Sequence, residues 1–107
     1  MEAKTYSFVG VVVPVSTPKY INMDVTGEEG FFSMQVSTTG GSLTVELECS
    51  NDGGANFDPP EGVAAIISAM AAGRKFKLFD VPVCDAFRLK LSAATTDVTA
   101  TINMRVK

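Results

Sequence analysis

Side chains able to do acid–base or nucleophilic chemistry are sparse in this sequence, and histidine is absent altogether. Histidine is the usual general base and metal ligand near neutral pH, so Ser-His-Asp and Cys-His arrangements are excluded within the chain. The carboxylates Glu46 and Glu48 share the solvent face of one alternating segment, whereas glycoside hydrolysis needs a carboxyl group with a raised pKa in a cleft. Both Gly-Gly pairs resemble hairpin turns rather than a phosphate-binding loop. We therefore expect no catalytic residues, no cofactor and no enzymatic activity.

Two cysteines, Cys49 and Cys84, are the remaining reactive groups. They are too few and too far apart in the sequence for a disulfide framework or a zinc site. Each lies beside apolar residues of a predicted strand, so we expect two buried thiols that act as small hydrophobic side chains.

The densest polar stretch is ECSNDGGANFDPP, residues 48–60. A calcium site there would draw on Asn51, Asp52, Asp58 and Glu61, because calcium takes six to eight oxygen ligands. The alternate spacing of an EF-hand loop is absent, so we favour a structural turn and expect no metal site.

Four residues of this stretch, Ser50, Asp52, Gly54 and Phe57, stand in the order S-x-D-x-G-x-x-F. The order resembles the Asp-box hairpin, with Phe57 in place of Trp and Asn56 in place of Thr. In such a turn the Asp52 carboxylate accepts backbone N–H groups, the glycines adopt positive φ, and the Phe57 ring folds onto the core. Asp boxes are structural in the proteins that carry them, so the resemblance implies no activity.

Period-two alternation of apolar and polar residues dominates the chain and predicts strands with one buried face. The clearest examples are 42–50, 86–93 and 97–107, and the weaker ones are 5–15, 19–26, 31–37 and 75–83. In 75–83 the pattern sets apolar Phe76 and Leu78 against Lys75 and Lys77, which predicts the apolar pair on the buried face. Turn signals separate strands by about 8–12 residues, which is typical of an antiparallel β-sandwich.

We thus predict an all-β fold: one antiparallel β-sandwich of about seven or eight strands, jelly-roll or immunoglobulin-like, forming a single domain over 1–107. The segment 61–73 leaves two possibilities open. Apolar residues at helical spacing and a following glycine allow a short helix near 62–72, while a short strand followed by a turn fits equally well.

Charge and hydropathy bear on two classes of partner, nucleic acids and membranes. The formal net charge is −3 and the pI about 4.8, which argues against a nucleic-acid binder with a basic surface. No stretch of about 18 apolar residues is present, and the first residues do not form a signal region, so we expect no membrane association.

Three features together resemble small β-sandwich proteins of tailed-bacteriophage virions and prophages. They are the strand ending in Ser-Asn-Asp-Gly-Gly with an aromatic residue three positions later, the segment 79–91, and the Thr-rich segment 96–106. The resemblance covers residues 43–106. It implies a non-enzymatic virion protein made in the host cytoplasm, most of all a capsid decoration (cement) protein that binds across capsid subunits. It supplies no functional residue to carry over.

Two other functions remain open: a carbohydrate- or receptor-binding module of a phage tail or fibre, and a tail-tube or adaptor component. The first would use exposed aromatic rings, although no tryptophan is available for stacking.

The apolar stretch near the start of the chain predicts a contact with other subunits. Residues 1–13 hold more hydrophobic surface than one edge strand needs, so we expect an edge strand or arm that packs against a neighbouring subunit. The predicted interface residues are Phe8, Val9, Val11, Val12 and Val13. By analogy with capsid three-fold sites we expect a homo-oligomer, with a trimer favoured.

Overall fold

The computed structural model describes residues 4–23, 31–81 and 84–106, and these ranges form eight β-strands. The strands are β1 (Lys4–Val13), β2 (Lys19–Met23), β3 (Phe31–Thr39), β4 (Leu43–Ser50), β5 (Ile67–Met70), β6 (Gly73–Asp80), β7 (Ala86–Ala93) and β8 (Val98–Val106). The predicted strand at 19–26 continues into residues that lie outside the described ranges. The all-β prediction is confirmed.

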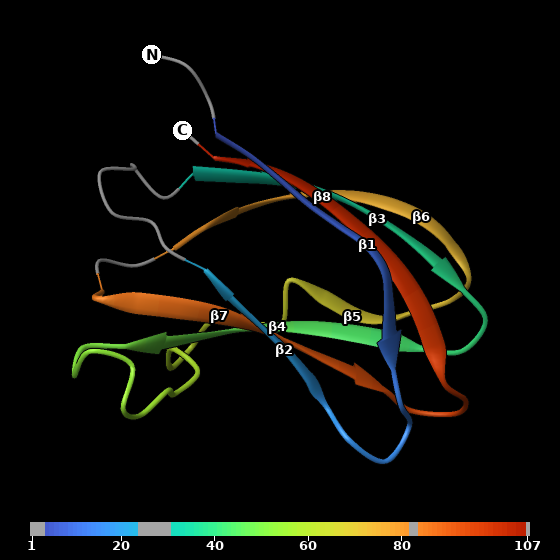
Figure 1. The fold of residues 1–107 in the computed structure, drawn as a ribbon, viewed down its shortest axis with the longest axis horizontal. Coiled ribbons are helices and arrows are strands. Elements are labelled where there is room, and N and C mark those ends of the chain that lie inside the picture. The colour runs from blue at the N-terminus through green and yellow to red at the C-terminus, as the bar shows by residue number, and fades with distance from the viewer. Residues whose placement is uncertain (1–3, 24–30, 82–83, 107) are drawn as a thin grey trace.

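Two four-stranded antiparallel sheets face each other, with strand orders β1-β8-β3-β6 and β2-β7-β4-β5. Figure 1 shows the first sheet as the upper layer and the second as the lower layer. Most successive strands pass from one sheet to the other, and the orders are those of a jelly roll. The structure therefore selects the jelly roll over the immunoglobulin-like arrangement.

The core lies between the sheets and is built from the alternation seen in the sequence. β7 alternates buried and half-buried residues, and β8 buries every second residue from Val98 to Val106. Because successive side chains of a strand point to opposite faces, each of these strands presents one apolar row to the facing sheet. Phe32 on β3 joins the rows, stacking on Phe79 with ring centroids 4.9 Å apart and meeting Phe87 edge-on at 5.3 Å.

The helix considered near 62–72 is wrong. Ile67–Met70 form β5, which pairs with β4 through Leu43↔Met70 and Val45↔Ile67. The register shifts between these pairs, and Ala69 has a φ of 49°. This irregularity brings two buried side chains three positions apart onto one face, which is the spacing that also suggests a helix.

The expected orientation of β6 is also wrong. Its register pairs Lys77 with the buried Met34 and Lys75 with the buried Val36, so both lysines lie on the side of the strand that faces the core. Phe76 and Leu78 lie on the outer face of the sheet and are 64% and 76% exposed. The reason is that β6 is an edge strand, and its core-facing side is not fully covered by the opposite sheet.

Candidate functional site

The loop after β4 is a compact turn held by its own side chains. Ser50 Oγ donates a hydrogen bond to Asp52 Oδ1 at 2.6 Å and accepts one from the backbone N–H of Gly54 at 3.0 Å. Asp52 accepts from the backbone N–H of Asn56 at 3.0 Å and from its side-chain amide at 2.8 Å. Gly53 and Gly54 adopt positive φ, which allows the chain to close within so few residues.

These hydrogen bonds stabilise the ionised form of Asp52. The Ser50 hydroxyl, followed by the two Asn56 donors, lowers the pKa of the Asp52 carboxyl from 3.8 to about 2. The oxygens of this carboxylate already accept hydrogen bonds from three donors of the same loop. This geometry matches a structural role for the loop. Within the part of the chain that the structure describes, no group of three or more acidic or cysteine side chains is arranged to hold a metal ion.

Phe57 does not fold onto the core as expected. Its ring lies over the guanidinium group of Arg88 at 4.4 Å, and the Tyr20 ring lies over the same group at 4.0 Å. Arg88 Nε also donates to Glu48 Oε1 at 2.7 Å, which leaves Glu48 only 9% exposed. We call Tyr20, Glu48, Phe57 and Arg88 the Arg88 cluster. It fixes the loop to the outer face of the sheet β2-β7-β4-β5.

The two cysteines, far apart in the sequence, are neighbours in the fold. Both are free thiols, and both line a cleft of about 350 Å³ next to Asp58. Burial raises the pKa of the Cys49 thiol to about 12, and the adjoining Cys84 adds to the shift. A thiol with so high a pKa is protonated at neutral pH, so Cys49 is a poor nucleophile.

The structure divides the predicted interface residues of β1 into two groups. Val13 is fully buried in the core, and Phe8 and Val11 pack partly against the core. These three side chains therefore contribute to the fold of the single chain. Val9 is 78% exposed and Val12 53% exposed. β1 is an edge strand with a register irregularity between Phe8 and Val11. Val9 and Val12 therefore form a small exposed apolar surface at the sheet margin.

A larger apolar surface lies at the opposite margin of the same sheet and was missed from the sequence. Phe31 on β3 and Phe76 and Leu78 on β6 are 58%, 64% and 76% exposed. The register sets Ser33 opposite Leu78, and Phe31 one step further along, so the three side chains share the outer face. We call them the apolar strip. The sequence held one indication of this arrangement. Phe79 follows Lys75 and Lys77 at alternate positions, so burial of Phe79 places both lysines on the core-facing side and leaves Phe76 and Leu78 on the outer face.

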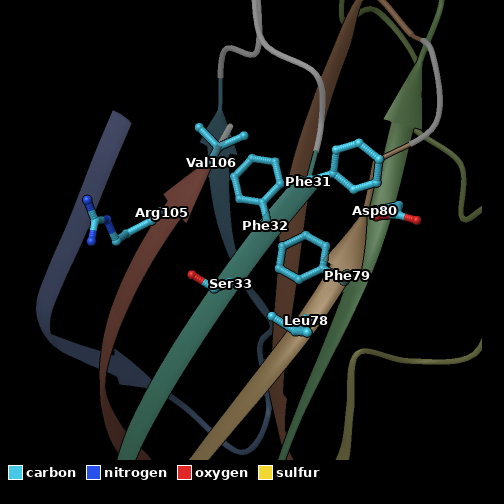
Figure 2. Close-up of a pocket in the computed structure, with 8 residues that line it drawn as sticks. All are labelled: Phe31, Phe32, Ser33, Leu78, Phe79, Asp80, Arg105 and Val106. Carbon is cyan, nitrogen blue, oxygen red and sulfur yellow. The ribbon is translucent and has the colours of Figure 1, made fainter. Parts of the chain in front are cut away.

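A cleft of about 450 Å³ adjoins the apolar strip. Figure 2 shows the aromatic rings of β3 and β6 gathered at one end of the sheet, with Arg105 on β8 extending away from them. The cleft is lined by Phe31, Phe32, Ser33, Leu78, Phe79, Asp80, Arg105 and Val106. Its lining is predominantly apolar with a few polar groups at the rim, which is the composition of a surface that binds a partner.

The core-facing side of β6 borders a second opening of about 400 Å³. Lys77 and Phe79 lie on its β6 wall, and the segment 63–66 with Leu47 forms the other wall. Val63 in this wall is 56% exposed. Leu78, Phe79 and Asp80 line both openings, so this end of β6 borders concave surface on more than one side.

The candidate site of this molecule is thus the exposed apolar strip of the jelly roll with the two openings that adjoin β6. No helix within the described ranges is long and apolar enough to cross a membrane.

Three comparisons with known proteins were informative only at the level of solved structures. No protein-family model and no curated protein matches the chain. The solved structure of the SPBc2 prophage-derived protein YomS is similar, with a TM-score of 0.58 and 14% identity over 100% of this chain and 96% of that one. Weaker likenesses are the carbohydrate-binding module CBM36 with calcium and xylotriose (TM-score 0.46, 12% identity, 96% and 91% covered) and infectious bursal disease virus, Gx strain (0.38, 9%, 99% and 32%). At this level of identity the YomS likeness establishes a shared fold.

Proposed function

We propose that this chain is a non-enzymatic structural protein of a bacteriophage virion, and that it acts as a capsid decoration protein. The observation that carries the proposal is the apolar strip beside its cleft. Its three large apolar side chains are each more than half exposed on one face, and exposed apolar patches mark contacts with other proteins. The jelly-roll fold shared with a prophage-derived protein supports the virion setting.

The strip can supply the energy of attachment. Full burial of a Phe or Leu side chain is worth about 1.5–3 kcal/mol, and each of the three is already partly covered. Burying what remains exposed would contribute about 3–6 kcal/mol for each copy, which alone gives weak binding. A decoration protein acts at many equivalent capsid positions, and contacts between neighbouring copies raise the overall avidity.

Contacts between copies would involve the other margin of the sheet. Val9 and Val12 are exposed on edge strand β1, far across the sheet from β6. We propose that they pack against a second copy in a homo-oligomer, with a trimer favoured, while the apolar strip faces the capsid. Light scattering of Val9→Ser/Val12→Ser against the unchanged protein tests this; the same mass for both would refute it.

Co-sedimentation with undecorated capsids tests the proposed function. Phe76→Ser/Leu78→Ser should reduce the bound fraction at least tenfold, because it removes most of the apolar strip. The control is Ser37→Ala, at an exposed outer-face position of the same sheet, which should bind normally. Equal binding by both variants would contradict the proposal.

The alternative is a carbohydrate- or receptor-binding module of a tail or fibre. One observation favours it: the exposed Phe31 ring stands at a cleft whose rim includes Ser33 and Asp80. The loop at 48–60 no longer supports it, because Phe57 is covered by Arg88. Saturable glycan binding that is abolished by Phe31→Ala, without capsid binding, would establish this alternative.

A further inference from the structure

Strand β6 is the edge of its sheet, and it pairs with β3 on one side alone. Along its other side, the backbone N–H and C=O groups of alternate residues have no strand partner among the strands that the structure describes. Such an edge can accept an extended chain as an additional strand, with the main chain supplying affinity and alternate side chains supplying specificity.

The side chains of β6 alternate between two chemistries. The outer face carries the apolar Phe76 and Leu78. The core-facing side carries Lys75 and Lys77, which are exposed. Among residues 4–23, 31–81 and 84–106 the structure records no ion pair for either ammonium group. The charge is local, since the whole chain carries a net charge of −3 while the eight residues of β6 hold three cations and one carboxylate.

Two copies of β6 are poor partners for each other. An antiparallel pair centred on Phe76 would set Lys75 of one copy directly opposite Lys77 of the other, and a parallel pair in register would align all the cations. Like charges directly opposite are destabilising. Lysines on an edge strand, especially on its inward side, are a common protection against such association. These registers disfavour a second β6, and the excess of cations on the strand favours an occupant with acidic side chains.

We propose that β6 is a strand-addition site for an extended segment of a partner protein in which apolar and acidic residues alternate. Its acidic side chains pair with Lys75 and with Lys77, which lines the opening beside 63–66. Its apolar side chains extend the apolar strip formed by Phe76, Leu78 and Phe31. The free edge, the excess of cations on β6 and the two openings at its Leu78–Asp80 end carry the inference. It rests on the proposed function in that the partner is a virion subunit.

A synthetic peptide tests the site directly. The probe is a blocked ten-residue peptide of alternating valine and glutamate, labelled for fluorescence anisotropy, and the control peptide has lysine in place of glutamate. The glutamate peptide should bind the unchanged protein and the lysine peptide should not. On binding, amide hydrogen exchange should slow at alternate residues of β6. Absence of glutamate-peptide binding, or protection at another strand, would overturn the proposal.

Charge reversal supplies the second arm. Lys75→Glu/Lys77→Glu should weaken binding of the glutamate peptide by more than tenfold at low salt, because it loses two exposed ion pairs of about 0.7 kcal/mol each and adds repulsion between like charges. The same variant should gain binding to the lysine peptide. Lys75→Gln/Lys77→Gln is the neutral control and should lie between. Unchanged peptide preference in the reversed variant would refute the role of the lysines.

The outcomes separate this inference from the proposed function. Peptide binding at β6 without capsid binding would leave the strand-addition site standing and remove the decoration role. Capsid binding that depends on the apolar strip but not on the lysines, with no peptide binding, would support the decoration role and remove the strand-addition site.

Discussion

Replacing Arg88 by methionine should destabilise the protein strongly, because one side chain holds four segments together. The guanidinium group lies between the Tyr20 and Phe57 rings at 4.0 and 4.4 Å from their centroids and pairs with Glu48 at 2.7 Å. Methionine keeps the apolar stem of the side chain and removes the charge. The change therefore isolates the ion pair and the ring contacts from simple loss of packing.

The magnitude follows from the burial of the group. The Arg88 and Glu48 side chains are 25% and 12% exposed, so the pair stands between a surface ion pair worth about 0–1 kcal/mol and a buried one whose breakage costs about 3–5 kcal/mol. Loss of two cation–π contacts adds about 1–2 kcal/mol. We expect a loss of about 3 kcal/mol in the free energy of unfolding, which lowers the Tm by about 15 °C for a domain of this size.

A double-mutant cycle in urea, with Glu48→Gln as the second change, separates the ion pair from the stacking. Glu48→Gln combined with Arg88→Met should be less costly than the sum of the two single variants by about 1–2 kcal/mol, because the double variant leaves no unpaired buried charge. Lys90→Met, two residues along the same face of β7, is the control and should change stability by less than about 0.5 kcal/mol. A coupling energy near zero, or an Arg88→Met cost no larger than that of the control, would refute this reasoning.

Three further predictions concern the backbone and the loop. Gly41→Ala should lower stability by about 2 kcal/mol in chemical denaturation, because φ is +60° and an added Cβ would lie 2.7 Å from Val98 Cγ2. Ala69→Gly should raise the free energy of unfolding by about 0.5 kcal/mol and Ala69→Val should lower it by more than about 1 kcal/mol, since the φ of 49° is costly for a branched side chain; equal values would contradict the strain. Because the folded pKa of Asp52 is lowered from 3.8 to about 2, its contribution to stability is full above about pH 4 and is lost as the pH falls through 2. Carbon NMR titration of the Asp52 carboxyl should show the low midpoint, and Ser50→Ala should move it upward.

The fold was largely predictable from the sequence because its central strands obey simple alternation. β7 and β8 each have neighbours on both sides, so their inner rows face the core along the whole length and the period-two pattern is complete. The local hydrogen bonds of the turn at Asp52 were equally accessible, since donor and acceptor lie within four residues.

The Arg88 cluster could not be predicted in this way. Its members come from β2, β4, the following loop and β7, and no spacing along the chain links Tyr20 to Phe57. The same holds for Cys49 and Cys84, which the strand pairing brings together across 35 positions of sequence. Local pattern gives the face on which a residue lies, whereas strand order decides which residues meet there.

The sequence left β5 open between a helix and a strand, and it predicted the wrong buried face for β6. Both strands are sheet edges, where one side lacks a strand and where burial no longer selects the residue type at every second position. At β6 the usual arrangement is inverted, with Lys75 and Lys77 toward the core side and Phe76 and Leu78 toward solvent. Apart from Phe79, which stacks on Phe32, the apolar residues of β6 remain in water and add little to the stability of the isolated fold. Its pattern is better explained by what lies beyond the edge: lysines that oppose pairing with another copy of β6, beside apolar side chains that a partner of opposite charge can cover.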